Sequence, residues 1–246
     1  MSEDKPLIDH IYAEKQVDVQ GFRFDEKVTQ VFADMIRRSV PGYGLTLQMI
    51  AILAGQYAQK GTVLYDLGCS LGASTLAMRH GVGIYDCQIV GVDNSQDMLK
   101  QCQDYVDEDE ASIPVQLRCE NVQDTIIENA SMVVLNFTLQ FIPLHERESL
   151  LKRIYQGLKP GGVLVLSEKV SFDDLGKNDC LTTLHEAFKR SQGYSEMEVS
   201  QKRQALENVL LPESPQMHHQ RLGQAGFANS HTWFQCFNFV SILAFK

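Results

Sequence analysis

The stretch Val63-Leu-Tyr-Asp66-Leu-Gly68-Cys-Ser70-Leu-Gly72, followed by Ile89-Val-Gly-Val-Asp93, decides the fold. It indicates a strand, a glycine-rich turn and a helix, and then a second strand that ends in an acidic residue. Glycine lets the backbone turn tightly and approach a ligand without a side chain in the way. A carboxylate at the end of the second strand can accept hydrogen bonds from both hydroxyls of a ribose. The combination predicts a nucleoside site at the carboxyl edge of a parallel sheet.

The glycine spacing narrows the choice of ligand. A dinucleotide fingerprint is Gly-x-Gly-x-x-Gly, whereas Ser70 stands here at the second glycine position and no phosphate-loop lysine follows. This departure argues against NAD and ATP and favours a nucleoside without phosphates, above all S-adenosyl-L-methionine (SAM). The separation of Gly68 from Asp93 is close to the roughly 20 residues expected of such a pair. With the later Leu158-Lys-Pro160-Gly-Gly162-Val-Leu-Val-Leu, the set resembles the class I SAM-dependent methyltransferase fold.

Apolar runs alternate with helical patterns along the middle of the chain. We expect strands at 62–67, 88–93, 114–119, 131–137 and 162–168, and helices at 72–80, 95–107 and 145–158. This alternation predicts an α/β, Rossmann-like fold with a mainly parallel sheet and right-handed crossovers. Two further runs, 231–236 and 238–245, predict a terminal antiparallel pair that completes seven strands.

The pattern divides the chain into four segments. Residues 1–60 are predicted to form an N-terminal arm, mobile over 1–23, and a helical cap that starts after Asp25 and breaks at residues 41–44. Residues 61–170 form the SAM-binding core. Residues 171–213 form a helical insertion that serves as a lid or a dimer element, clearest over 196–211. Residues 214–246 supply the last helix and the strand pair that complete the core.

Composition limits the class of substrate. The 246 residues carry a formal net charge of -9. A protein that grips nucleic acid normally carries a basic patch, because phosphate neutralisation supplies much of the affinity. The basic residues of this chain are scattered among acids, so we expect a small-molecule substrate and no direct binding of nucleic acid.

Location and metal content follow from simple patterns. No apolar run approaches the length of a membrane span, and the N-terminus lacks the features of a signal peptide. The six cysteines form no Cys-x-x-Cys pair, and the seven histidines form no His-Glu-x-x-His motif. We therefore expect a cytoplasmic protein with no membrane contact, no metal and no disulfide framework.

Backbone and carboxylate groups of the turn are the first candidate ligand contacts. Gly68, Cys69 and Ser70 would meet the ligand mainly through their backbone, and the turn is expected to place backbone donors there. The alternative for the glycines is a purely geometric role in the turn. Asp93 has a similar alternative as an acidic cap on the helix that follows, and the ribose and capping roles can coexist.

Residues at later strand ends are further candidates. Asn121 can read the adenine amino group through its carbonyl oxygen, and Val122 can pack on the adenine ring. The alternative is a solvated strand end. Asn136 ends an apolar run and needs polar partners once it is buried. It either contacts the methionine portion of SAM or makes an internal hydrogen bond.

Arg203 and Tyr43 have two interpretations each. Arg203 falls close to a helical stripe made by Val199, Leu206 and Leu210. Its guanidinium either extends to water or meets an anion through its bidentate fork. Tyr43 lies in a Pro-Gly-Tyr-Gly turn, where its ring either reaches over a ligand or packs on the core.

Longer segments carry a more specific resemblance. They are Arg38-Ser-Val-Pro-Gly-Tyr43, Asp66-Leu-Gly-Cys-Ser-Leu-Gly72, Asp93-Asn94-Ser95, Glu128-Asn-Ala-Ser-Met-Val-Val-Leu-Asn-Phe-Thr-Leu-Gln-Phe141, Tyr194-Ser-Glu-Met-Glu-Val-Ser-Gln-Lys-Arg203 and Trp233-Phe-Gln-Cys-Phe-Asn-Phe239. Across nearly the whole chain they resemble the carboxy-S-adenosyl-L-methionine synthase family. The resemblance implies a homodimeric transferase that converts SAM and prephenate into carboxy-SAM and phenylpyruvate. In that family the product later serves a separate enzyme that modifies the wobble uridine of bacterial tRNA.

The resemblance also implies the site residues. It assigns the catalytic positions to Arg203, which recognises the added carboxylate either within its own subunit or across the subunit interface, and to Tyr43. The positions that match the family's ligand contacts are Tyr43, Gly68, Cys69, Ser70, Asp93, Asn94, Asn121, Val122, Asn136 and Arg203. The sequence departs from the family at Glu120-Asn121-Val122, where Gly-Asp-Ile is common.

The chemistry leaves two alternatives. No Asn-Pro-Pro-Tyr acceptor motif follows the fourth strand, so the usual sign of a methyl acceptor is missing. For the synthase we hypothesise that hydroxide lost as prephenate aromatises supplies the base, and that the sulfonium ylide traps the released carbon dioxide. The alternatives are a small-molecule SAM-dependent methyltransferase and a non-catalytic SAM-binding module of a tRNA-modifying complex.

Overall fold

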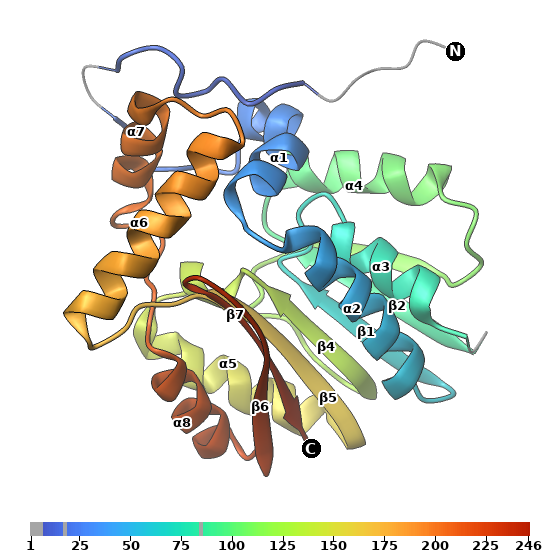
Figure 1. Ribbon diagram of the computed structural model, residues 1–246. Helices are drawn as coiled ribbons and strands as arrows, with labels where there is room; N and C mark the ends of the chain where they lie inside the picture. Colours follow the sequence, from blue (N-terminus) through green and yellow to red (C-terminus); the bar gives the residue numbers. More distant parts are fainter. Residues whose placement is uncertain (1–6, 17–18, 84–85) are drawn as a thin grey trace.

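The protein is built around one seven-stranded sheet. The computed structural model describes residues 7–16, 19–83 and 86–246 (Figure 1). The strand order is β3-β2-β1-β4-β5-β7-β6, in which β1 to β5 pair in parallel and β7 runs antiparallel to both of its neighbours. The predicted sheet and its antiparallel terminal pair are confirmed. The strands are β1 Thr62–Leu67, β2 Cys87–Asp93, β3 Val115–Cys119, β4 Ala130–Asn136, β5 Leu158–Lys169, β6 Asn229–Cys236 and β7 Phe239–Phe245.

Five of the helices in the described part of the chain begin at a residue whose side chain caps them. Asp25 accepts from the backbone N–H of Val28, and Ser95 accepts from that of Met98, so each satisfies a donor that the helix leaves free. The helices are α1 Glu26–Ser39, α2 Tyr43–Tyr57, α3 Ala73–Gly81, α4 Gln96–Glu108, α5 Leu144–Gly157, α6 Leu175–Ser191, α7 Glu196–Leu206 and α8 Pro215–Ala225, with a short 3-10 turn at Leu139–Phe141. In the described part of the chain, none of them is long and apolar enough to cross a membrane.

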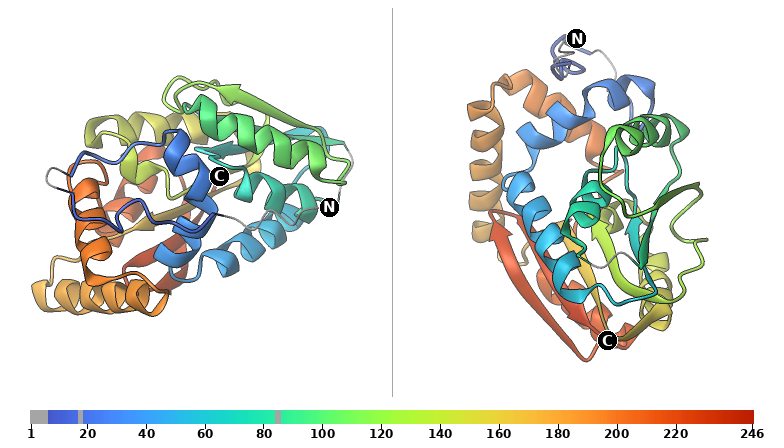
Figure 2. Two further views of the ribbon diagram at one scale, coloured as in Figure 1. Left: turned by 90° about the horizontal axis from the view of Figure 1, so that it is seen from above. Right: turned by 90° about the vertical axis from the view of Figure 1, so that its right-hand side faces the viewer.

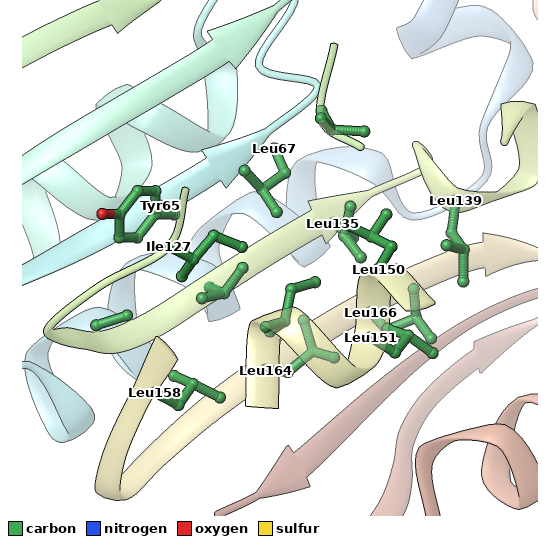
Figure 3. Packing of buried hydrophobic residues seen from close by; sticks show 14 of the residues in the cluster. Tyr65, Leu67, Ile127, Leu135, Leu139, Leu150, Leu151, Leu158, Leu164 and Leu166 are labelled. Carbon is green, nitrogen blue, oxygen red and sulfur yellow. The ribbon is translucent and has the colours of Figure 1, made fainter. Parts of the chain in front are cut away.

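The inner strands β2, β1, β4, β5 and β7 are mostly buried on both faces, which explains why they are largely apolar. The edge strands β3 and β6 are partly exposed. On one face, Tyr65, Leu67 and Leu135 pack against α5 through Leu150 and Leu151 (Figure 3). On the other face, α2 and α3 supply Ile50, Ala54 and Met78, which pack against Leu64, Ile89 and Met132. This rigid centre fixes the carboxyl ends of the strands, where the candidate site lies.

The N-terminal arm packs over one end of the molecule, together with α1 and α7 (Figure 2). The backbone N–H of Asp9 donates to Asp34 in α1 (2.9 Å), and that of Phe22 donates to the carbonyl of Ala205 in α7 (3.0 Å). Tyr12 and Phe22 are buried. The prediction of a mobile arm over 1–23 is therefore wrong for residues 7–16 and 19–23, because they carry buried side chains without a periodic pattern. Residues 1–6 and 17–18 lie outside the described residues.

Three element boundaries differ from the prediction. The break expected at residues 41–44 is shorter than predicted, because Gly42 takes a left-handed φ of 79° and serves as the N-cap of a helix that begins at Tyr43. The insertion helix expected over 196–211 ends at Leu206 and continues as a turn. The strand expected at 162–168 runs from Leu158, which already pairs with Ala130, and residues 159–162 form a bulge before pairing resumes at Val163.

Candidate functional site

The glycine-rich turn after β1 is held in an unusual backbone conformation. Gly68, Ser70 and Gly72 have φ angles of 81°, 50° and 83°. A Cβ on Gly68 would lie 2.4 Å from side-chain atoms of Thr138, so only glycine allows this approach. The N–H groups of Gly68 and Cys69 both donate to the carbonyl of Val92 (2.7 and 2.9 Å).

The N–H groups of Gly68 and Cys69 are therefore already used within the protein and are not the free backbone donors that we expected from the turn. The N–H of Ser70 is also used within the protein, because it donates to Asp93 Oδ2 (2.9 Å). These internal hydrogen bonds hold a left-handed backbone that would otherwise be unfavourable. What the turn offers a ligand is its shape and its closeness to the cavity, since Gly68, Cys69 and Ser70 all line it.

Asp93 ends β2 and faces the cavity. Its two carboxylate oxygens each accept one backbone N–H, from Ser70 and from Ser95 (both 2.9 Å). Burial raises the pKa of Asp93, and the backbone donors oppose this shift. Each carboxylate oxygen has a second lone pair, so both can still accept from a diol. The N-cap of α4 is Ser95, and Asp93 accepts the backbone N–H of that residue. Asp93 therefore holds the start of the helix, and its two predicted roles can coexist.

A cavity of about 370 Å³ lies at the carboxyl edge of the sheet, beneath α1 and α7. Aromatic rings form much of its wall, including Phe22 and Phe24 of the arm, Phe141, and Phe137 beside Phe239 (ring centroids 5.9 Å apart). Most of the predicted site residues meet there. The predicted residues that line the cavity are Tyr43, Gly68, Cys69, Ser70, Asp93, Asn94, Val122 and Asn136.

Asn121 lies at the rim of this cavity. It is exposed and does not line the cavity, whereas the next residue, Val122, is buried and does. Asn121 Oδ1 accepts from Asn94 Nδ2 (3.1 Å), and Asn121 Nδ2 donates to Asp124 (3.1 Å). The structure thus places Asn94, Asn121 and Val122 side by side, close to Asp93.

Asn136 ends β4 in the position that the sequence predicts. Its Nδ2 donates to Ser74 Oγ (3.1 Å), but its Oδ1 is buried without a hydrogen-bond partner. A buried carbonyl oxygen without a partner costs free energy. Because this side chain also lines the cavity, a ligand that donates a hydrogen bond there would remove that cost.

Tyr43 enters the cavity from the first turn of α2. Gly42 fixes its position, since a Cβ on that glycine would lie 2.4 Å from the ring of Phe234 in β6. The ring centroids of Tyr43 and Phe137 are 6.3 Å apart. Burial raises the pKa of Tyr43, so its hydroxyl stays protonated at neutral pH and can donate a hydrogen bond.

Arg203 does not line the cavity of its own chain. Its side chain is 73% exposed on α7, and Nη1 forms an ion pair with Glu186 of α6 (3.2 Å). The structure thus separates this predicted residue from the others. The sequence leaves open whether the Arg203 guanidinium extends to water or meets an anion. Within a single chain, it extends to solvent.

Cationic side chains at the far end of the cavity were not predicted. Lys169, Lys189 and Lys202 line the cavity, as does His185. Lys169 ends β5, so a charged residue directly after a buried strand was the available signal. His185 and Lys189 stand four residues apart on α6 and share one face. Neither signal is specific, because the same patterns occur on solvated helices.

His185 contributes no charge to this end of the cavity. Burial lowers the pKa of His185 to about 3, and its Nε2 donates to the carbonyl of Ser39 (2.8 Å). The imidazole is therefore neutral and packs edge-on against Phe239 (4.8 Å between centroids). Among the residues that the structure describes, no group of three or more His, Cys, Asp or Glu side chains is arranged to hold a metal ion.

Known proteins are similar to this chain in fold, and others are similar to it in sequence. A family model described as "Methyltransferase domain" matches residues 64–162. Human N-acetylserotonin methyltransferase, solved in complex with SAM, superposes with a TM-score of 0.62 at 18% identity, over 90% of this chain and 55% of that one. At that identity the likeness concerns the fold alone, and it agrees with the predicted class I methyltransferase architecture.

Two relatives match at the level of the whole sequence. A protein from Colwellia psychrerythraea is 55% identical over 97% of this chain and 98% of its own length. A protein from Citrifermentans bemidjiense is 53% identical over the same shares of the two chains. Both are named carboxy-S-adenosyl-L-methionine synthase. At this identity and coverage, the chain belongs to the carboxy-S-adenosyl-L-methionine synthase family.

Proposed function

We propose that this chain is an enzyme that converts SAM and prephenate into carboxy-SAM and phenylpyruvate. The observation that carries the proposal is the sequence similarity to proteins named carboxy-S-adenosyl-L-methionine synthase over 97% of the chain. The cavity supports it, since Asp93, Asn136 and three lysines all line it. SAM is a substrate here, and the donor of the carboxyl group is the second substrate.

The proposed ligand roles follow the geometry of the cavity. Asp93 accepts the ribose hydroxyls through its remaining lone pairs, and Val122 packs on the adenine. Asn121 and Asn94 hold the adenine end at the rim. Asn136 Oδ1 accepts from the ammonium group of the methionine portion, which supplies the partner that this buried oxygen lacks. The reacting methyl group then lies near Tyr43, beyond the ends of β1 and β4.

The reaction balances without a base from the protein. Prephenate aromatises to phenylpyruvate as it loses carbon dioxide and hydroxide. The hydroxide removes a proton from the sulfonium methyl group, which gives water and an ylide. The ylide carbon attacks carbon dioxide and forms the new carbon–carbon bond of carboxy-SAM. The protein positions both substrates and keeps bulk water away, and the protonated Tyr43 hydroxyl donates a hydrogen bond to the carboxylate that forms.

We further propose that Arg203 anchors the new carboxylate from a second copy of the chain. An arginine fork matches a carboxylate in charge and geometry. Because the guanidinium lies outside its own cavity and is mostly exposed, a symmetric homodimer is the arrangement that would deliver it to a neighbouring site. The ion pair with Glu186 would hold the arginine extended toward the neighbouring site.

The product is a small molecule that leaves the enzyme. In this proposal it supplies the carboxymethyl donor for a separate enzyme that makes 5-oxyacetyluridine at the tRNA wobble position, so this chain needs no contact with tRNA. A reducing cytoplasm suits the six free cysteines, since Cys119 and Cys180 are exposed without pairing.

Product analysis tests the proposal. Purified protein is incubated with SAM and prephenate, with no methyl acceptor, and the nucleosides are separated and weighed by mass spectrometry. We expect a nucleoside heavier than SAM by one carboxyl group and an equal amount of phenylpyruvate. Intact SAM and prephenate, under conditions where SAM binding is demonstrated, would contradict it. S-adenosylhomocysteine formed only when an acceptor is added would instead identify an ordinary methyltransferase.

A further inference from the structure

Two lysines, one buried and one partly buried, face the cavity without a partner from the described residues of the protein. Lys189 of α6 is only 7% exposed, and Lys169 at the end of β5 is partly buried. Both line the cavity. In the described part of the chain, neither ammonium group has a hydrogen-bond acceptor or an ion-pair partner. A buried charge without a partner is costly and rare in a folded protein.

The third lysine of the cavity differs from these two. Lys202 Nζ donates to Ser39 Oγ (2.9 Å) and forms an ion pair with Asp9 of the arm (3.4 Å). Asp9 also accepts from the hydroxyl of Tyr194. These contacts satisfy Lys202 within the protein and give it a structural role, joining the arm to α7. The uncompensated charge therefore belongs to Lys169 and Lys189.

Nearby acids do not compensate that charge. Glu186 is the acidic group whose charge raises the pKa of both lysines. It is already paired with Arg203. Glu168, next to Lys169 in sequence, has a pKa raised to about 8 by burial, so it is mostly protonated at neutral pH. Burial lowers the pKa of Lys189 to about 7 and also lowers the pKa of Lys169, and a carboxylate bound between them would favour the charged form of both.

Lys169 lies at the carboxyl edge of the sheet, on the strand next to the one that ends in Asn136. Asn136 at the end of β4 pairs with Ser167 of β5, and Lys169 follows two residues later. Gln140 Oε1 accepts from the backbone N–H of Lys169 (2.9 Å), which fixes the lysine at the cavity. The rings of Phe137 and Phe239 line the same region. It thus combines an apolar wall with a cationic end.

We propose that Lys169 and Lys189 form a carboxylate-binding subsite that holds the carboxyl donor by the carboxylate it keeps. This proposal rests on the proposed function. The ligand class is a small dicarboxylate with an apolar ring. Its retained carboxylate meets the two ammonium groups, its ring lies along Phe137 and Phe239, and its transferable carboxylate points toward the sulfonium.

The chemistry favours this division of the two carboxylates. Loss of carbon dioxide removes the negative charge from the carboxylate that leaves. An ammonium group held against that carboxylate would stabilise the starting state more than the transition state and would slow the reaction. The retained carboxylate keeps its charge throughout, so lysines can bind it without that penalty. Arg203 then meets only the carboxylate that forms on SAM.

Kinetics of Lys169→Met and Lys189→Met test the subsite. Methionine keeps the length of the side chain and removes its charge. We expect KM for prephenate to rise roughly 10- to 100-fold in each variant, the range of a lost charge-assisted hydrogen bond. The dissociation constant for SAM, measured by calorimetry without prephenate, stays within about twofold of the unmodified enzyme. Phenylpyruvate keeps the retained carboxylate, so its inhibition constant rises by the same factor as KM.

A matched control separates this effect from a general loss of positive charge. Arg190→Met removes a cation from the next, exposed position of the same helix and leaves all three constants unchanged. A circular-dichroism melt of each variant confirms that it is folded.

The outcomes distinguish the subsite from the proposed function. If the unmodified enzyme forms carboxy-SAM and both lysine variants keep its KM for prephenate, the subsite is wrong and the proposed function stands. If the variants lose SAM affinity instead, the lysines hold the methionine carboxylate of SAM and the subsite is again wrong. If the unmodified enzyme binds SAM but forms no carboxy-SAM, the proposed function fails, and the subsite with it.

Discussion

Replacing Lys189 by methionine should make the protein more stable while it weakens the use of the carboxyl donor. Burial is the largest cause that lowers the pKa of Lys189 from 10.5 to about 7, and the charges of Lys169 and Lys202 lower it further. A folded state that holds this lysine charged is destabilised relative to the unfolded chain. Methionine fills the same space and carries no charge to desolvate.

The magnitude follows from that pKa. A tenfold change in a protonation equilibrium corresponds to about 1.4 kcal/mol, so the fully charged lysine costs the folded state on the order of 5 kcal/mol. Water that enters the open cavity and small adjustments of the side chain reduce this figure. We expect Lys189→Met to gain roughly 2 kcal/mol, which raises Tm by roughly 4–8 °C in a chain of this size.

The effect has a defined dependence on pH. The folded pKa of Lys189 is below the unfolded value, so the unfolded chain binds more protons between pH about 7 and 10.5. The destabilisation is fully present below pH 7 and disappears as pH rises toward 10.5. Lys169 and Lys202, whose pKa values burial also lowers, keep their own contributions in the variant. The stability gap between the two proteins should therefore close with rising pH.

Thermal and urea unfolding, followed by circular dichroism below pH 7 and near pH 10, measure this gap. Arg190→Met serves as the control, and its exposed position predicts no change in Tm. A Lys189→Met protein that is less stable than the unmodified enzyme would refute the reasoning, because it would mean that the ammonium group makes a favourable contact in the free protein. A gap that does not depend on pH would also refute it.

Three further changes test other parts of the site. Asp93→Ala should weaken SAM binding by at least about tenfold in calorimetry, since it removes the proposed ribose acceptor, and unchanged affinity would exclude that role. Gly68→Ala should cost roughly 2–4 kcal/mol of stability in urea unfolding, because a Cβ would lie 2.4 Å from Thr138; a loss below about 0.5 kcal/mol would show that the turn relaxes freely. A one-to-one mixture of Arg203→Ala and Asp93→Ala chains, at a SAM concentration where each is inactive alone, should regain about one quarter of normal activity through mixed dimers. No recovery after verified subunit exchange would place Arg203 in its own site.

The sheet and most of the nucleoside end could be predicted because local sequence encodes them. Buried parallel strands need continuous apolar residues, and the turn after β1 needs glycine at left-handed positions. Asp93 and Asn136 stand where such strands end, so their meeting at one edge follows from topology alone. The roles proposed for them remain predictions that ligand binding must test.

The cationic end of the cavity could not be predicted in the same way. Lys169 and Lys189 belong to different elements, and only the packing of α6 over the end of β5 brings them to one cavity. The arm gave no signal because its contacts, such as Asp9 with Asp34 and Gln16 with Gln201 (2.6 Å), join residues far apart in the chain. Neither the sequence nor the structure of a single chain assigns the role of Arg203, because the ligand proposed for it lies in another subunit.

The most direct test of carboxyl transfer traces the carbon itself. Prephenate labelled with carbon-13 in its ring carboxylate is incubated with the enzyme and SAM, and the nucleoside product is examined by mass spectrometry and carbon NMR. We predict that the label appears in the new carboxyl group of carboxy-SAM, with one phenylpyruvate formed for each label transferred. Label found only in free carbonate, with SAM unchanged or converted to S-adenosylhomocysteine, would contradict the account.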